Sequence, residues 1–229
     1  MPGLHQANKS VCRLLPAQSG AGGERGAVMK RTCVEAVLLA AGYSSRMGEL
    51  KPLLPLGGTT VIRRQVEMLQ SVADRIIVVT GYRGEEVEHH LSGSGAYIVQ
   101  NPRFGEGMFT SVKAGIRSLK PETDAFLILP VDYPLVTGRM IRQLLKVYEG
   151  SGDCLVAYPS SRMRKGHPPV ISASCTRQIL AYDGELGLKG ALKAFDGFAC
   201  YMETEDMRCV MDMDTPADYR KILAALAVG

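Results

Sequence analysis

The sequence predicts an α/β fold in which a mostly parallel sheet is covered by helices on both faces. Short, almost continuously apolar runs alternate along the chain with stretches that have the 3.6-residue periodicity of amphipathic helices. Strands buried on both faces are expected to be apolar throughout, whereas strands with one wet face alternate apolar and polar residues. The 229 residues are enough for one domain with a sizeable core.

Up to residue 159, the patterns predict five strands and four helices. The strands are the apolar runs at residues 34–40, 75–81, 96–101, 124–130 and 153–159. The helices are the amphipathic stretches at residues 59–72, 84–91, 108–119 and 137–149. Beyond residue 166 the pattern is less regular, and we expect a strand at 168–172, helices at 174–181 and 187–195, a strand at 198–203 and a last helix from 216.

Residues 1–31 differ in composition from the rest and are predicted to form a disordered N-terminal extension. They are rich in Gly, Gln, Ser and Ala without periodicity, and Met29 opens a stretch that resembles a natural start. They also hold five Lys and Arg residues against one Glu, which accounts for the whole formal charge of +4. Residues 32–229, predicted to be a single domain, are therefore neutral, which argues against a nucleic-acid partner.

The cysteine and hydropathy patterns indicate a cytoplasmic protein. The six cysteines are scattered, without a CxxC pair or a nearby His that would suggest a zinc site, and reduced thiols are expected. No apolar run approaches the ~20 residues of a membrane span, so no membrane partner is expected. Arg13 and Pro16 interrupt the one short patch that resembles a signal peptide.

The loop LLAAGYSSRMGELKPLLPL at residues 38–56 follows the first predicted strand and is a candidate phosphate-binding loop. In an open α/β sheet, ligands bind at the carboxyl ends of the strands. Its glycine spacing fits neither a P-loop nor GxGxxG. It nevertheless combines a small-residue turn at 40–42 with the hydroxyls of Ser44 and Ser45 and the cations of Arg46 and Lys51, which together suit a polyphosphate. The alternative is a surface turn that is merely basic.

Asp132 is a candidate metal ligand. It lies in the segment LILPVDYPL, after an apolar run that is expected to be a buried central strand. A carboxylate at the carboxyl end of a strand can hold a hard cation such as Mg²⁺. The alternative is a helix N-cap, but Thr137 and Gly138 are better placed to start the next helix.

The segment VMDMDTPADY contains a helix start and two further acids. Thr215, Pro216 and Asp218 fit an N-cap, a proline at the first helical position and an acid three residues after the cap. Asp212 and Asp214 point to the same side of an extended segment and can therefore face a metal together. Asp214 is the stronger candidate because the helix start fixes its backbone.

Five motifs resemble those of the nucleotidyltransferases of the molybdenum cofactor group, MobA-like proteins, and most closely the molybdenum cofactor cytidylyltransferases. They are LLAAGYSSRMGELKPLLPL, NPRFGEGMFTSV, PVDYP, GHPPV and DMDTPADY, in this order, and the similarity runs from about residue 33 to the C-terminus. The resemblance implies a Rossmann-like three-layer sandwich with a mostly parallel mixed sheet, like that of the nucleotide-diphospho-sugar transferases.

The resemblance also assigns roles to residues within the motifs. It implies catalytic roles for Arg46, Lys51 and Asp132, and Mg²⁺ binding by Asp132, Asp214 and Asp212. The implied nucleotide-binding residues are Ala40, Ala41, Gly42, Ser44, Arg46, Lys51, Gly81, Asn101 and Ser111. The implied acceptor-binding residues are His167 and Lys189.

Enzymes of this group transfer a nucleoside monophosphate from a nucleoside triphosphate to a phosphorylated small-molecule acceptor, such as molybdopterin cofactor, and release pyrophosphate. Because the acceptor phosphate is already an anion at neutral pH, this chemistry needs no general base. The Ala-Ala-Gly turn at 40–42 resembles the cytidylyltransferase version of the loop, which favours CTP over GTP. The resemblance further implies a handover contact with a molybdoenzyme or chaperone.

Two departures from the family pattern lie in the acceptor half. Tyr133 stands where cytidylyltransferases often have Gln or Met, and GELGLKG replaces a Gly-Asp-x-Gly-x-Arg segment. The sequence therefore supports the nucleotidyltransferase class more strongly than the identity of the acceptor. The alternatives are a nucleotidyltransferase of the same fold that acts on a sugar phosphate or an alcohol phosphate, and an inert nucleotide-binding regulator.

Overall fold

A computed structural model of the chain describes residues 31–227. The chain divides into two units, Met1–Arg31 and Thr32–Gly229, and the fold below is that of the second. The predicted disordered extension lies outside the described residues, apart from Arg31.

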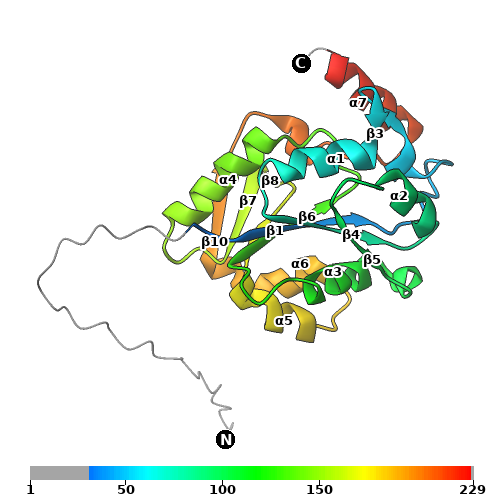
Figure 1. The fold of residues 1–229 in the computed structure, drawn as a ribbon. Helices are drawn as coiled ribbons and strands as arrows, with labels where there is room; N and C mark the ends of the chain where they lie inside the picture. Colours follow the sequence, from blue (N-terminus) through cyan, green and yellow to red (C-terminus); the bar gives the residue numbers. More distant parts are fainter. Residues whose placement is uncertain (1–30, 228–229) are drawn as a thin grey trace, which may run out of the picture. The chain divides into compact units, whose positions relative to one another are not determined.

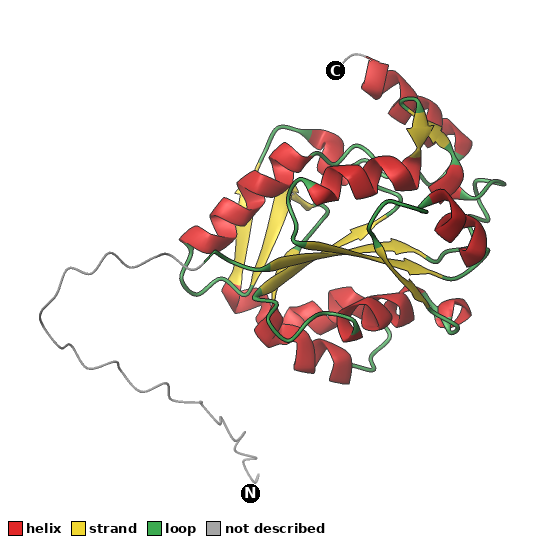
Figure 2. Cartoon of the chain, in the orientation of Figure 1, coloured by secondary structure: helices red, strands yellow, loops and turns green. Residues whose placement is uncertain are grey.

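An eight-stranded mixed sheet forms the middle layer of the second unit (Figures 1 and 2). Its strands are β1 (Val34–Ala40), β4 (Arg75–Thr80), β5 (Tyr97–Gln100), β6 (Ala125–Pro130), β7 (Val156–Ser161), β8 (Arg164–Lys165), β9 (Val170–Ser172) and β10 (Ala199–Glu203). The order is β10-β7-β9-β6-β1-β4-β5, with β8 paired to β7. Only the pairings of β9 and β8 are antiparallel among the strands of this sheet in residues 31–227, so the predicted mostly parallel mixed sheet is confirmed.

Helices cover both faces of the sheet (Figure 1). On one face lie α1 (Val61–Gln70), α2 (Gly84–His90) and α4 (Gly138–Gly150), and α7 (Pro216–Ala227) lies on the same side but farther from the sheet. On the other lie α3 (Met108–Arg117), α5 (Thr176–Ala181) and α6 (Gly187–Leu192). Successive residues of β1 alternate between two cores, with Leu38 in the first and Val37 in the second, as the two-residue strand period requires. The predicted three-layer arrangement is therefore confirmed.

The structure adds short elements, and three of them correct an end of a predicted helix: residues 59–60 are a strand, and residues 174–175 and 193–195 belong to 3₁₀ turns. The short elements are the hairpin strands β2 (Pro55–Leu56) and β3 (Thr59–Thr60) and the 3₁₀ turns η1 (Lys51–Leu53), η2 (Phe104–Glu106), η3 (Ala173–Cys175), η4 (Lys193–Phe198) and η5 (Met207–Val210). The predicted start of a strand at residue 153 is wrong by three residues. Cys154 N–H donates to the Ser151 carbonyl (2.9 Å), so this apolar segment begins as a turn.

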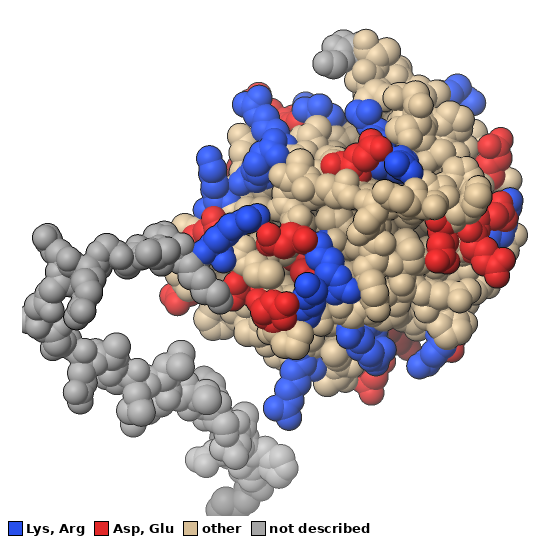
Figure 3. Space-filling model, in the orientation of Figure 1, with Lys and Arg blue, Asp and Glu red and all other residues tan. Residues whose placement is uncertain are grey.

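Several coarse properties of the described part bear on function. No helix within residues 31–227 is long and apolar enough to cross a membrane. The five cysteines in the same part of the chain are free thiols. On the face seen in Figure 3, positive and negative side chains are intermingled rather than separated by sign.

Candidate active site

The loop after β1 is curled by its own polar groups. Ser44 adopts a left-handed backbone (φ 55°), and its carbonyl accepts from Met47 N–H at 2.9 Å. The Ser44 hydroxyl oxygen accepts from Lys51 N–H at 3.0 Å, where η1 begins. These bonds fix the backbone from which the Lys51 side chain extends, and only 8% of that side chain is exposed.

Asp132 lies just beyond the end of the central strand β6. The strand continues its pairing with β1 through Val131 N–H, which donates to the Leu39 carbonyl at 3.0 Å. Met213 N–H donates to the Asp132 carbonyl at 2.8 Å. This bond joins the end of β6 to the segment that precedes α7, although the two are about eighty residues apart.

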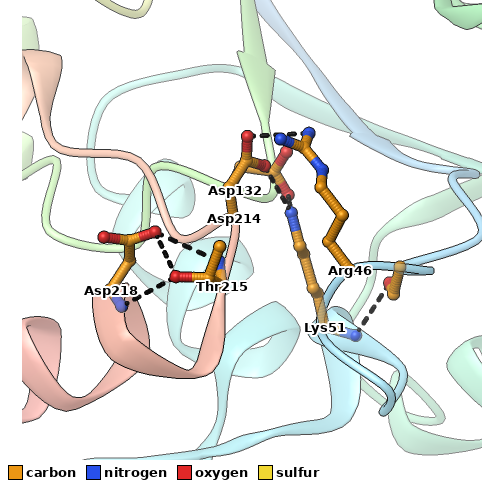
Figure 4. A network of polar contacts seen from close by, with 7 residues as sticks. Arg46, Lys51, Asp132, Asp214, Thr215 and Asp218 are labelled. Carbon is orange, nitrogen blue, oxygen red and sulfur yellow. Dashed lines mark hydrogen bonds and ion pairs between the residues drawn. The ribbon is translucent and has the colours of Figure 1, made fainter.

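The start of α7 fixes Asp214. Thr215 and Asp218 form the predicted capping box: Thr215 Oγ1 accepts from Asp218 N–H (3.3 Å), and Asp218 Oδ2 accepts from Thr215 N–H (3.1 Å). Met213 is fully buried while Asp214 keeps contact with solvent, which matches the predicted alternation of an extended segment. The helix start therefore positions Asp214 beside Asp132 (Figure 4).

Arg46, Lys51, Asp132 and Asp214 form one charge cluster (Figure 4). Lys51 Nζ lies 2.8 Å from Asp214 Oδ1 and 3.2 Å from Asp132 Oδ1, so its ammonium bridges the two carboxylates. Arg46 Nη2 lies 2.8 Å from Asp214 Oδ2, and 69% of the Arg46 side chain is exposed. Two cations and two carboxylates thus cancel in formal charge.

The two carboxyl groups of the cluster differ in their pKa. Burial raises the pKa of Asp132 more than Lys51 lowers it, and the neighbouring Asp214 and Asp212 raise it further. The hydrogen bond from Lys51 lowers the pKa of Asp214, and Arg46 adds to this effect. Asp214 is therefore the better anion, because two cations contact it directly.

The carboxylates also determine what kind of metal site is possible. No group of three or more His, Cys, Asp or Glu that could hold a metal occurs among the described residues. Mg²⁺ is, however, commonly bound by one or two carboxylates together with substrate phosphates and water. Asp132 and Asp214 already converge on one cation, the Lys51 ammonium, so their oxygens fit this requirement. Asp212 is exposed and forms no ion pair within residues 31–227, and its role as a metal ligand stays a prediction.

A cavity of about 300 Å³, the nucleotide cavity below, opens beside the charge cluster. Seven residues predicted to serve the nucleotide or metal line it: Ala40, Ala41, Gly42, Ser44, Lys51, Ser111 and Asp132. The lining also includes Tyr43, Phe104, Gly107 and Met108, which sequence reasoning missed. Three of these four lie in the motif NPRFGEGMFTSV, in which only Asn101 and Ser111 are predicted to bind the nucleotide.

Two predicted nucleotide-binding residues have structural roles outside this lining. A Cβ on Gly81 would lie 2.6 Å from Phe104 Cβ and 2.8 Å from the Ala41 carbonyl, so close packing requires glycine there. Asn101 is buried, and its Nδ2 donates to the hydroxyls of Thr110 and Ser111 at 2.8 and 2.9 Å. It thereby fixes the first turn of α3. A nucleotide contact stays a prediction for both residues.

A second cavity of about 1090 Å³, the wide cavity below, adjoins the nucleotide cavity. Leu39, Gly107, Met108 and Pro130 line both. His167 and Lys189, the predicted acceptor-binding residues, line the wide cavity. Further basic residues of its lining, absent from the sequence predictions, are Lys113, Lys165 and Lys193.

His167 connects the wide cavity to the neighbourhood of Asp132. Its ring packs against that of Tyr133 at an interplanar angle of 40°, with centroids 4.3 Å apart, and Tyr133 directly follows Asp132. Burial lowers the pKa of His167 to about 4, so the imidazole is neutral at pH 7. Burial also raises the pKa of Tyr133 to about 12. His167 and Tyr133 therefore form an uncharged aromatic pair next to the charge cluster.

The fold and the cluster together define an α/β protein that presents cations and paired carboxylates at the carboxyl edge of its sheet. Residues 36–198 match the sequence model of the MobA-like NTP transferase domain. The chain belongs to this family.

Individual relatives agree with this assignment. The chain is 30% identical over 189 residues to the molybdenum cofactor cytidylyltransferase of Escherichia coli K12, covering 82% of this chain and 94% of that protein. A nucleotidyl transferase from Methanothermobacter has a similar structure (TM-score 0.74, 28% identity, 86% of this chain and 98% of the other). Rv0371c of Mycobacterium tuberculosis, solved in complex with manganese, shares the fold (TM-score 0.69, 20% identity, 85% and 100% coverage).

Proposed function

We propose that the protein is a Mg²⁺-dependent nucleotidyltransferase that transfers CMP from CTP to a phosphorylated acceptor, such as molybdopterin cofactor, and releases pyrophosphate. The observation that carries this proposal is the convergence of Arg46, Lys51, Asp132 and Asp214 at the edge of the nucleotide cavity. The chemistry requires two anions to meet, and cations at the reacting phosphate are the means by which proteins stabilise such a step.

Each member of the charge cluster has a distinct role in this proposal. Arg46 and Lys51 bind the triphosphate, where a guanidinium fork and a point charge complement phosphate oxygens. Asp132 and Asp214 hold Mg²⁺, which when bound supplies positive charge at the phosphates. The acceptor phosphate needs no general base, and His167, whose pKa is about 4, is accordingly assigned to acceptor binding and not to proton transfer.

The size of the wide cavity supports a bulky acceptor. At about 1090 Å³, it has more than three times the volume of the nucleotide cavity. A simple sugar phosphate or alcohol phosphate would leave most of this space to water, whereas ligand sites usually bury most of the ligand surface. His167 and Lys189 are proposed to contact this acceptor. A handover contact with a molybdoenzyme or chaperone, in the cytoplasm, is the corresponding step after transfer.

The test is a substrate panel read by pyrophosphate release. The protein is incubated with each of the four nucleoside triphosphates, Mg²⁺ and either molybdopterin cofactor or a panel of sugar and alcohol phosphates. We expect release with CTP and molybdopterin cofactor. Asp132→Asn is expected to keep the fold and to slow transfer on the order of a thousandfold, because it loses several kcal/mol of transition-state stabilisation. Turnover of Asp132→Asn at the parent rate would contradict the metal assignment.

The base preference is tested separately from phosphate binding. Ala41 lines the nucleotide cavity, so Ala41→Gly is expected to narrow the preference for CTP over GTP. The preference itself is expected to be about 1–3 kcal/mol, because one small side chain controls it. Lys51→Ala is expected to weaken the binding of all four triphosphates alike, since Lys51 contacts only the phosphates that they share. If all four triphosphates stabilised the wild-type protein equally against thermal unfolding, CTP would be excluded as the preferred nucleotide, and the proposed phosphate site would be unaffected.

A further inference from the structure

The position of the Lys51 ammonium between two carboxylates has a consequence for metal binding. Paired carboxylates at the carboxyl edge of the sheet are where a divalent cation is expected, and in the structure they contact a side-chain cation (Figure 4). Arg46 contacts the remaining oxygen of Asp214. Both cations that the proposed function assigns to the triphosphate are thus engaged with the carboxylates assigned to the metal.

We propose that Lys51 acts as a built-in substitute for the divalent cation, so that metal and triphosphate bind cooperatively. The proposal rests on the proposed function for the identity of the triphosphate, but not for the competition between Lys51 and the metal. A metal that binds alone must displace an ammonium held at 2.8 and 3.2 Å. A triphosphate that binds alone must separate Lys51 and Arg46 from their carboxylates. Each ligand therefore performs part of the rearrangement that the other needs.

The surroundings of the cluster favour exchange of a side chain over movement of the backbone. Asp132 is tied to the segment before α7 through its carbonyl, and the capping box fixes the residue after Asp214. The Lys51 backbone is tied to Ser44. The backbone at these positions is therefore held in place, and the exchange falls to side chains, chiefly the four-carbon stem of Lys51.

Burial makes the exchange all-or-none. With 8% of its side chain exposed, Lys51 reaches too little water to replace a lost carboxylate partner, and a buried cation without a partner is costly. It must lie either on the carboxylates or on an incoming anion. Thermodynamic linkage then requires that the triphosphate strengthen metal binding by the same factor by which the metal strengthens triphosphate binding.

The test uses Mn²⁺ as the probe and needs no triphosphate. Binding of Mn²⁺ alone is measured from the loss of the electron paramagnetic resonance signal of the free ion. Wild-type protein is expected to bind Mn²⁺ weakly, and Lys51→Met to bind it about 10-fold more tightly or better, within the usual range of coupling between sites. Lys51→Arg, which keeps a cation, is expected to remain weak.

Two controls locate the effect. Lys146→Met removes an exposed lysine of α4 outside both cavities and is expected to leave Mn²⁺ affinity unchanged. Asp132→Asn added to Lys51→Met is expected to abolish the gain, because it removes one of the two carboxylates. If Lys51→Met melts below the assay temperature, Lys51→Gln replaces it, since its amide still donates a hydrogen bond to the carboxylates.

A second measurement separates this proposal from the proposed function. CTP and inorganic tripolyphosphate are titrated in excess EDTA, where Lys51→Met is expected to bind both at least about 5-fold more weakly than wild type. Failure of CTP to bind wild-type protein even at saturating Mn²⁺ would contradict the proposed function and leave the Mn²⁺ result standing. Mn²⁺ binding to Lys51→Met that is no tighter than to wild type, or a gain that survives Asp132→Asn, would overturn the substitute role of Lys51.

Discussion

At the residue scale, His167 shows how burial turns an ordinary side chain into a pH-sensitive element. Its ring is packed against Tyr133, and its Nδ1 is buried without a hydrogen-bond partner among the described residues. A backbone hydrogen bond at Ile128 favours the charged imidazole, but it compensates only part of the hydration that burial removes. The folded protein therefore keeps His167 neutral down to a pH of about 4, whereas the ordinary value is 6.5.

This shift predicts a loss of stability in mild acid. Between pH 6.5 and about 4 the unfolded chain binds a proton at His167 that the folded chain does not, so the free energy of unfolding falls as the pH falls. Above pH 6.5 the contribution is constant. Between pH 7 and pH 5 the loss should be about 2 kcal/mol. Urea unfolding of wild type and His167→Gln at both pH values measures it, and the variant is expected to lose less.

His89→Gln is the matched control for this measurement, because His89 lies on the exposed side of α2. It should follow the wild-type dependence on pH. An equal loss in wild type and His167→Gln would mean that His167 titrates normally in the folded protein and that the ring pair is open to water.

At the scale of the element, the position of α3 depends on the absence of one side chain. A Cβ at Gly115 would lie 2.3 Å from Val37 Cγ1 in β1 and 3.1 Å from Val79 Cγ2 in β4. The helix therefore packs closer to the sheet than alanine permits. Since Met108 and Ser111 on its first turns line the nucleotide cavity, this close approach also sets the shape of that cavity.

Gly115→Ala is expected to destabilise the protein by about 1–3 kcal/mol, because overpacking exceeds the ~1 kcal/mol that alanine gains over glycine within a helix. Gly150→Ala is the matched control: it lies at the end of α4, and a Cβ there would meet nothing within 4 Å. That variant should be neutral or slightly stabilised. Urea unfolding compares the two. Equal stability of both variants would show that α3 can move away from the sheet at no cost.

Local signals explain which elements could be predicted from the sequence. Strands β1, β4 and β6 are continuous apolar runs, and the caps of α4 and α7 depend on residues three positions apart, so both kinds of feature are visible in short windows. The start of β7 could not be predicted from a short window, because Cys154 and Leu155 are equally apolar in a turn and in a strand. The two-residue strands β2, β3 and β8 are too short to show a period.

At the scale of the whole molecule, topology explains why part of the site was predictable. The end of β1, the end of β6 and the segment before α7 meet at one edge of the sheet, so residues in three separate motifs could be expected to converge. The bridging position of Lys51 could not be predicted, since it depends on side-chain packing. Most of the wide cavity was missed for a similar reason: its lining comes from segments between residues 39 and 196 that share no periodic pattern.

The adjoining cavities predict that acceptor binding and triphosphate binding separate by mutation. Lys189 lines the wide cavity but not the nucleotide cavity, and it forms no ion pair within residues 31–227. Lys189→Ala is therefore expected to raise the KM for the acceptor about 10-fold, as the loss of one hydrogen bond to a charged group would. Its CTP dissociation constant should stay that of wild type, because the phosphates of CTP lie on the charge cluster.

Pyrophosphate release at varied acceptor concentration gives the KM, and calorimetric titration with CTP gives the dissociation constant. Lys146→Ala removes the same charge from the surface of α4, outside both cavities, and should change neither quantity. A KM that is unchanged in Lys189→Ala would remove Lys189 from the acceptor site. If Lys189→Ala weakened CTP binding as much as acceptor binding, the two cavities would form one continuous nucleotide site, since a lysine that lines only the wide cavity cannot otherwise affect the triphosphate.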